Sequence, residues 1–199
     1  MLVKGRCLKI TNKLFFLITV FLISKTVIAD NTKTRLLDYN KSLDNSSALF
    51  IQSDGENMQE GIIYIGSKRI KVEYINPQKI TIVISKNRGM YVNYELMETE
   101  YFNTNKSLVK IFYKIFMGDN FFKNSSLEVL SSNILIKDSF EIDDNFYKIE
   151  IIYENNPLKI RKVKVKENNQ TLEIGFYNHN KSEKISKDFF SLINPFLNN

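Results

Sequence analysis

The chain has 199 residues, with 28 lysine and arginine residues, 22 aspartate and glutamate residues, and one cysteine. Five of the basic residues and none of the acidic ones lie in residues 1–29, so the rest of the chain has a net charge of only +1. This near-neutral balance removes the charge-based support for nucleic-acid binding. Cys7 also lies in residues 1–29, so the remainder can form no disulfide and must rely on a packed core.

Residues 1–29 have the pattern of a cleavable secretory signal peptide. Four basic residues precede the apolar run Leu14–Ile23, and Val27-Ile28-Ala29 ends the segment with residues that a signal peptidase accepts. As a helix, a run of this length reaches about 15 Å, against about 30 Å of membrane hydrocarbon, which disfavours the alternative of a retained anchor. We therefore expect residues 30–199 to form a single exported domain that is free to diffuse.

The first half of the remaining chain reads as one short helix followed by strands. Residues 32–44 have the apolar spacing of an amphipathic helix, and residues 48–101 read mostly as strands with period-two alternation. Turn signals at Asn76-Pro77 and at residues 86–89 separate these strands, which is typical of an antiparallel meander.

A helical stripe interrupts this pattern at residues 108–116, where apolar residues recur with the spacing of one helix face until Gly118. Strand patterns resume at residues 146–153, 159–166 and 171–178. The sequence thus predicts a mainly β (α+β) fold whose amphipathic sheet is too large for its helices to cover, leaving a partly open apolar concavity.

Candidate catalytic groups are scarce. His179 lies in a polar stretch that reads as a solvated loop, and Asp143-Asp144 sits in a turn signal. There is no glycine-rich phosphate loop, and we expect no enzyme activity, metal or cofactor. The basic tract at residues 159–166 alternates like an ordinary strand, with Lys159, Arg161 or Lys162, Lys164 and Lys166 facing solvent.

Several short motifs stand in a characteristic order and spacing. They are SSALFIQ (46–52), Gly61-x-x-Tyr64, IKVEYINP (70–77), SLVKIFYKIF (107–116), NPLKIR (156–161) and FFSLINP (189–195). Together they resemble the periplasmic outer-membrane lipoprotein carrier family (LolA-like). The likeness covers about residues 35–196, and FFSLINP resembles the family's last strand and its ending.

The resemblance implies an incomplete antiparallel β-barrel, or half-barrel, with helices covering its open mouth. Such a protein shelters lipoprotein acyl chains in an apolar cavity. It takes acylated lipoproteins from an inner-membrane lipoprotein-releasing ABC transporter complex to an outer-membrane lipoprotein acceptor, and we expect it to act as a monomer. The sheet residues expected to line the cavity are Ile70, Val72, Tyr74, Ile82 and Ile84, and those expected on a lid helix are Leu108, Ile111, Phe112, Ile115 and Phe116. Any of them would look the same in an ordinary closed core.

The chain departs from the family at the lid latch, where relatives carry Arg-Pro and this sequence has Gly66-Ser67. Lys68 and Arg69 are the nearby candidates for the latch. Lys71 replaces a common arginine, and Ser107-Leu108 replaces a common Pro-Leu.

Three other functions compete with the carrier. The outer-membrane acceptor is a lipoprotein itself, and no cysteine near residue 30 could bear its lipid. A periplasmic binding module of the same fold would carry other lipids or acylated proteins. A structural envelope protein would fill its concave face with side chains.

Overall fold

The structure is a computed structural model that describes residues 31–118, 121–122 and 125–197. The predicted signal peptide and its cleavage site therefore lie outside the described residues. Residues 31–42 form the N-terminal helix. The other elements are β1 (Ser46–Ser53), β2 (Met58–Gly66), β3 (Arg69–Asn76), β4 (Ile80–Ile84), β5 (Arg88–Asn93), β6 (Glu98–Asn103), the 3₁₀ turn η1 (Thr104–Lys106), helix α2 (Val109–Met117), β7 (Ser126–Val129), β8 (Asn133–Ile142), β9 (Asn145–Asn155), β10 (Leu158–Glu167), β11 (Gln170–Lys181) and the 3₁₀ turn η2 (Lys187–Phe190).

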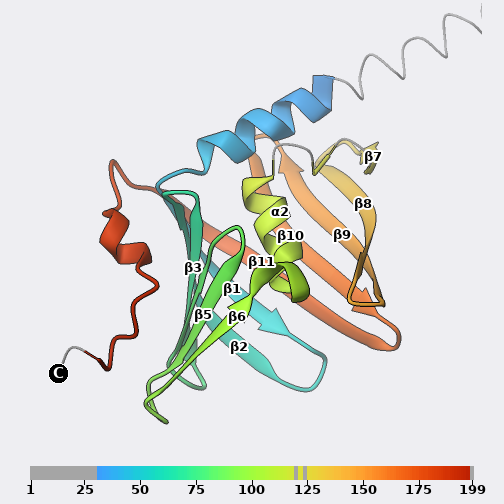
Figure 1. Cartoon of the computed structure of the whole chain (residues 1–199). Coiled ribbons are helices and arrows are strands. Elements are labelled where there is room, and N and C mark those ends of the chain that lie inside the picture. Colours follow the sequence, from blue (N-terminus) through green and yellow to red (C-terminus); the bar gives the residue numbers. More distant parts are fainter. Residues whose placement is uncertain (1–30, 119–120, 123–124, 198–199) are drawn as a thin grey trace, which may run out of the picture.

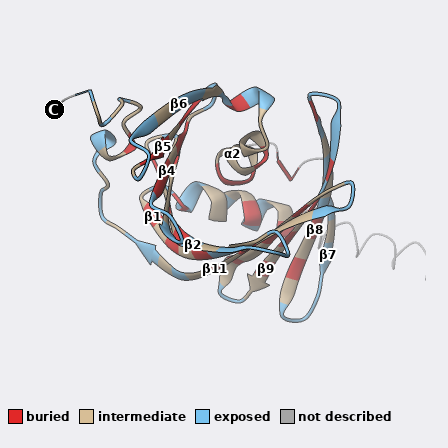
Figure 2. Ribbon diagram, turned by 90° about the horizontal axis from the view of Figure 1, so that it is seen from below, coloured by how far each residue is buried: buried red, intermediate tan, exposed pale blue. Residues whose placement is uncertain are grey.

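All eleven strands belong to one antiparallel sheet with the order β6-β5-β4-β3-β2-β1-β11-β10-β9-β8-β7. Two meanders therefore meet where β1 pairs with β11, and β6 and β7 are the free edges. The sheet curls around α2 without closing, and the N-terminal helix crosses one end of the concavity (Figures 1 and 2). This confirms the predicted half-barrel, with α2 on the chain segment that leads from one free edge to the other.

Strand alternation sets which side chains face the concavity. On β3, Ile70 is fully buried on the inner face, and Lys71 points outward to an ion pair with Glu73 (2.7 Å between Nζ and Oε1). On β10 the register shifts between Ile160 and Lys162, so that Arg161 and Lys162 both face outward. Arg161 pairs with Glu154 across the strands, which confirms the solvated basic face.

One half of the concave face is where the two helices pack most closely on the sheet. The N-terminal helix and α2 pack against the inner faces of β8–β11, where Leu36, Ile111 and Ile134 are all fully buried. The ring of Tyr39 meets the ring of Tyr153 edge-on, with centroids 5.8 Å apart. Burial of this apolar surface is the main stabilising contribution to the fold.

The C-terminal segment covers the outer face of the first meander. Val83, Met90 and Val92 are buried there beneath Leu192 and Phe196, and Phe190 is fully buried against Gly66. The expectation that residues 189–195 form a last strand was wrong, because this segment contains η2 and no ladder. The segment runs along the outside of the sheet instead (Figure 1), where Phe190 and Phe196 pack against it.

Two local expectations also fail. His179 lies in β11 and is half-buried, so it is not a loop residue, and burial lowers its pKa. Strand β8 was not predicted, since Asp138 interrupts its run of inward apolar residues. The Asp138 carboxylate accepts a hydrogen bond from the Ser125 hydroxyl at 2.7 Å, which allows it to lie on that face.

The core contains a buried hydroxyl group whose effect on stability can be measured. Tyr153 is fully buried, and its hydroxyl has no hydrogen-bond partner among the described residues. Burial, with a smaller contribution from nearby Tyr39, raises the pKa of Tyr153 far above its ordinary value. An unfolded tyrosine loses its proton near pH 10 and the folded one does not, so the free energy of unfolding should fall as pH rises above about 10.

Tyr153→Phe should reduce this alkaline loss of stability. At pH 7 it should leave the free energy of unfolding unchanged or raise it by up to about 1 kcal/mol, because an unsatisfied hydroxyl leaves the core. Urea denaturation of both proteins at pH 7 and above pH 10 measures this. A destabilisation of several kcal/mol at pH 7 would mean that the hydroxyl has a partner.

Candidate lipid-binding site

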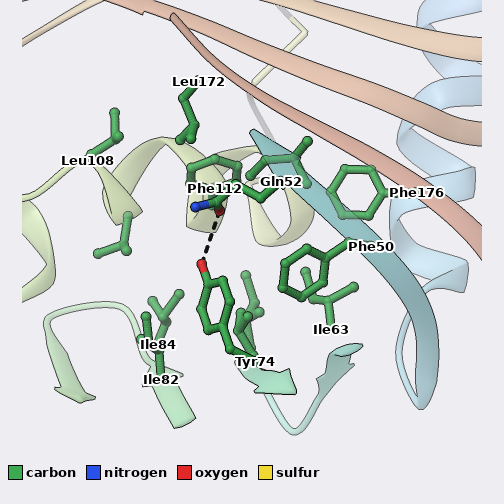
Figure 3. Close-up of a pocket in the computed structure, with 14 residues that line it drawn as sticks. Phe50, Gln52, Ile63, Tyr74, Ile82, Ile84, Leu108, Phe112, Leu172 and Phe176 are labelled. Carbon is green, nitrogen blue, oxygen red and sulfur yellow. Dashed lines mark hydrogen bonds between the residues drawn. The ribbon is translucent and has the colours of Figure 1, made fainter. Parts of the chain in front are cut away.

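An apolar cavity of about 190 Å³ lies between α2 and the inner faces of the central strands (Figure 3). Strands β1–β4 and β11 form its walls, and the start of α2 closes one side. The lining residues are Phe50, Gln52, Ile63, Ile70, Val72, Tyr74, Ile82, Ile84, Leu108, Val109, Phe112, Leu172, Ile174 and Phe176.

A glycine between two aromatic residues shapes the wall of this cavity. Gly61 on β2 lies directly opposite Phe50 on β1 and Tyr74 on β3. The two rings meet edge-on above it, with centroids 5.2 Å apart. A Cβ at Gly61 would lie 2.7 Å from the Phe50 ring and 2.3 Å from the Glu73 carbonyl oxygen, so only glycine allows this close approach.

The polar atoms at the cavity form one short chain of hydrogen bonds. The Tyr74 hydroxyl donates to Gln52 Oε1 at 3.0 Å (Figure 3), and Gln52 Nε2 donates to Gln59 Oε1 at 2.9 Å. Burial raises the pKa of Tyr74, so its hydroxyl stays protonated through the neutral range. The cavity can therefore hold a neutral apolar group and offers no charge to a reaction.

The structure places all five predicted sheet residues, Ile70, Val72, Tyr74, Ile82 and Ile84, in the lining of this one cavity. The predicted lid helix is present as α2, but its residues divide between two roles. Leu108 and Phe112 face the cavity, whereas Ile111, Ile115 and Phe116 are buried in the core. That these residues contact a ligand stays a prediction.

Helix α2 is held in place by few polar contacts. The Ser107 hydroxyl accepts a hydrogen bond from the Val109 N–H at its start, and the Gly118 N–H donates to the Lys114 carbonyl at its end. Among the described residues, two hydrogen bonds tie the helix to other elements. The Tyr113 hydroxyl donates to the Lys68 carbonyl at 3.3 Å, and Asn40 Nδ2 donates to the Ile115 carbonyl at 2.6 Å.

The candidate latch residues do not behave alike. The Arg69 guanidinium donates to the Phe190 carbonyl at 2.6 Å, so it fixes the C-terminal segment on the outer face. Lys68 reaches the lid through its main-chain carbonyl, which accepts the Tyr113 bond, and its ammonium group makes no ion pair with a described residue. The β2–β3 turn thus contributes a main-chain carbonyl, and no lysine side chain, to holding α2 in place.

Half of the lining was missed from the sequence. Leu172, Ile174 and Phe176 alternate along β11, and this alternation could have assigned them to an inner face. What it could not reveal is that β11 pairs with β1, since these strands lie far apart in the chain. Phe50 and Gln52 were missed for the same reason.

The size of the cavity sets a limit on what it can hold as it stands. An apolar protein cavity of about 150 Å³ takes up a molecule of the size of benzene. At about 190 Å³, this cavity is close to that size and too small for a long acyl chain. A larger apolar ligand would require α2 to move away from the sheet.

The model of the family described as outer membrane lipoprotein carrier protein LolA matches residues 41–193. The chain belongs to the LolA family. The match covers every strand of the sheet, α2 and most of the C-terminal segment. It supports a module that binds lipids or lipoproteins. A comparison with curated proteins gives no significant match.

Among solved structures, an uncharacterized conserved protein from Thermus thermophilus has a similar fold, with a TM-score of 0.53 and 9% identity over 81% of this chain and 91% of that chain. A chain of the Pseudomonas aeruginosa MucA/MucB complex aligns with a TM-score of 0.45 and 9% identity, over 80% and 59% of the two chains. LprF from Mycobacterium bovis gives 0.36 and 9%, over 79% and 96%. The first likeness supports the LolA-like fold alone, and nothing is inferred from the other two.

Neither helix within the described residues has the length and hydropathy of a membrane-crossing segment. The same residues contain no group of three or more His, Cys, Asp or Glu side chains arranged to hold a metal ion.

The hydrogen bond from Tyr113 to Lys68 allows a test of whether this contact slows the movement of α2. Tyr113→Phe removes one exposed hydrogen bond, whose net contribution is about 0.5–1 kcal/mol. A fluorescent fatty acid should therefore enter about two to five times faster in stopped-flow measurements. Tyr101→Phe is the matched control, because its hydroxyl also donates to a carbonyl, that of Leu192 at 3.2 Å, away from α2. Equal changes in both variants would contradict a lid-specific role.

Proposed function

We propose that this LolA-family protein is a periplasmic lipoprotein carrier that shelters acyl chains beneath α2 during transit. The observation that supports it most directly is the apolar cavity between α2 and strands β1–β4 and β11. Its lining is aliphatic and aromatic except for Gln52 and the Tyr74 hydroxyl, which hydrogen-bond to each other. Such a lining suits a hydrocarbon chain and no charged group.

The free energy of hiding an acyl chain explains why a carrier needs no covalent chemistry. A chain of about 16 carbons costs on the order of 12 kcal/mol when exposed to water, at about 0.8 kcal/mol per methylene. A cavity that covers most of the chain offsets this cost. A membrane or an acceptor can then replace the cavity as the apolar environment of the chain. Binding and release then depend on the position of α2.

In this proposal the small cavity belongs to the closed, empty form. Uptake displaces α2, and the cavity widens beneath Leu108 and Phe112. The lid is suited to this because few polar contacts hold it: within the described part of the chain, its hydrogen bonds to other elements are those of Tyr113 and Asn40. A lid whose closure is marginally favourable can be shifted by the differential affinity of a cargo.

The proposed route begins with export through a signal peptide at residues 1–29. A releasing ABC transporter complex in the inner membrane supplies the lipoprotein, and an outer-membrane acceptor receives it. The carrier acts as a monomer between them. The LolA family match supports these proposed partners, and the signal-peptide pattern supports the proposed periplasmic location.

The second candidate is a binding module of the same fold for other lipids or acylated proteins. The latch region favours it, because Gly66-Ser67 replaces the family's Arg-Pro and Arg69 binds the C-terminal segment. A lid held in a different way suits a different cargo or a different release signal.

Isolation from the periplasm tests the carrier directly. The tagged protein, purified under mild conditions, should co-purify with acylated lipoproteins that mass spectrometry identifies by their lipid-modified N-terminal cysteine. Free lipids without lipoproteins would favour the second candidate. Recovery from the cytoplasmic fraction, or an empty protein after mild isolation, would count against both.

Filling the cavity tests whether it is the binding site. Val72→Phe adds a ring within the lining and should lower the affinity for a fluorescent fatty acid at least about tenfold, since overpacking leaves no room for the chain. Ile75→Phe is the control on the same strand, because Ile75 is 61% exposed. Unchanged binding by the Val72 variant, with its fold intact by circular dichroism, would place the site elsewhere.

A further inference from the structure

A second hollow, of about 570 Å³, lies at the other end of α2. The N-terminal helix, the β2–β3 turn, the end of α2 and the chain after β11 surround it. None of its described lining residues lines the first cavity. Phe116 of this hollow and Phe176 of the first cavity meet edge-on between the two spaces, with ring centroids 5.8 Å apart.

The floor of this hollow is apolar and its rim is basic. Leu37, Ile65, Phe116, Met117 and Ile185 supply apolar lining. Lys41, Lys68, Lys184 and Lys187 also line the hollow, and we call it the lysine-rimmed hollow.

The four lysines come from three separate parts of the chain. Lys41 is on the N-terminal helix, Lys68 is in the β2–β3 turn, and Lys184 and Lys187 follow β11. They are therefore not one charged face of a single helix or strand. The fold brings them together around an apolar surface.

These lysines have little negative charge to balance them. Lys68, Lys184 and Lys187 form no ion pair with any residue that the structure describes, and Lys41 has only the exposed Asp38 at 3.9 Å. The strand lysines differ, since Lys162 and Lys164 both pair with Glu173.

Asp44 supplies a carboxylate to the described lining, and part of its hydrogen-bonding capacity is used within the protein. Its Oδ1 accepts the Ser67 N–H at 3.2 Å. The Lys181 ammonium group also donates to the main-chain carbonyls of Ser42 and Asp44, which adds a positive charge close by. The lysine-rimmed hollow thus presents an excess of positive charge to a ligand.

Asn40 adds one hydrogen-bond acceptor. Its Nδ2 donates to the Ile115 carbonyl, while its buried Oδ1 has no partner among the described residues. A ligand with a hydroxyl group beside its negative charge could satisfy this oxygen.

We propose that the lysine-rimmed hollow binds one anionic glycerophospholipid, with an acyl chain on the apolar floor, the phosphate among the lysines and a head-group hydroxyl near Asn40. Cations around an apolar surface match a molecule whose charge lies next to its hydrocarbon. The site is separate from the acyl cavity, so it does not depend on the carrier proposal. It would give the protein a lipid ligand besides any cargo.

The test compares two short-chain lipids, dihexanoyl phosphatidylglycerol and dihexanoyl phosphatidylcholine, below their micelle concentrations, by native mass spectrometry and calorimetry. The intact protein should bind the anionic lipid about tenfold or more tightly, and the preference should shrink with added salt. Lys68→Gln, Lys184→Gln and Lys187→Gln together should abolish the preference. Equal affinity for both lipids would overturn the proposal.

Lys86→Gln, Lys137→Gln and Lys148→Gln form the matched control, since these exposed lysines lie outside the hollow and the charge change is the same. The control variant should still prefer the anionic lipid. Loss of the preference in the control would mean that it depends on the net charge of the protein and not on the hollow. Inorganic phosphate should compete only weakly, and full displacement by it would indicate an anion site without a lipid.

Val72→Phe distinguishes the two cavities. It blocks the acyl cavity and should leave phosphatidylglycerol binding intact. If phosphatidylglycerol binding is lost in that variant but kept in the triple lysine variant, the lipid occupies the acyl cavity and the lysine-rimmed site is wrong. If both fatty-acid and phosphatidylglycerol binding are absent from the unaltered protein, both proposals fail.

Discussion

The architecture depends on how the chain crosses the gap between the two free edges of its sheet. After β6 the chain must reach β7 at the far edge, and the described part of that route runs through the concave side. Residues 108–116 make this passage as an apolar helix, because an apolar face inside a curled sheet is removed from water on all sides. The covering of the half-barrel is therefore a product of its connectivity, and no separate domain is needed.

One helix of this length cannot fill the whole concavity. Its buried face, with Ile111 and Ile115, packs on the side of the second meander, where the N-terminal helix also contributes to the core. On the side of the first meander, Leu108 and Phe112 stand off from the sheet and leave a hollow. Gly61 contributes to this cavity, because its missing side chain lets the Phe50 and Tyr74 rings lie across it and form an apolar wall. The cavity is thus bounded by side chains that also belong to the core, such as Ile70 and Phe50.

The sequence predicted local features well and long-range ones poorly. Alternation identified the inner face of β3, and helical spacing identified α2, because each pattern is set by neighbours in the chain. The pairing of β1 with β11 could not be read in this way, so the contribution of Phe176 was missed. Strand β8 was hidden because Asp138 faces inward beside Ser125. Phe190 packs closely on Gly66, where a Cβ would lie 3.1 Å from its ring. This contact joins residues far apart in the chain, so no local pattern reveals it.

An unclosed sheet has a mechanical property that a closed barrel lacks. Since β6 and β7 share no ladder, the distance between them can change through small adjustments of twist along eleven strands, and every backbone hydrogen bond in the sheet can stay intact. In a closed barrel the strand number and stagger fix the diameter. The width of the concavity can therefore change without the loss of any strand pair.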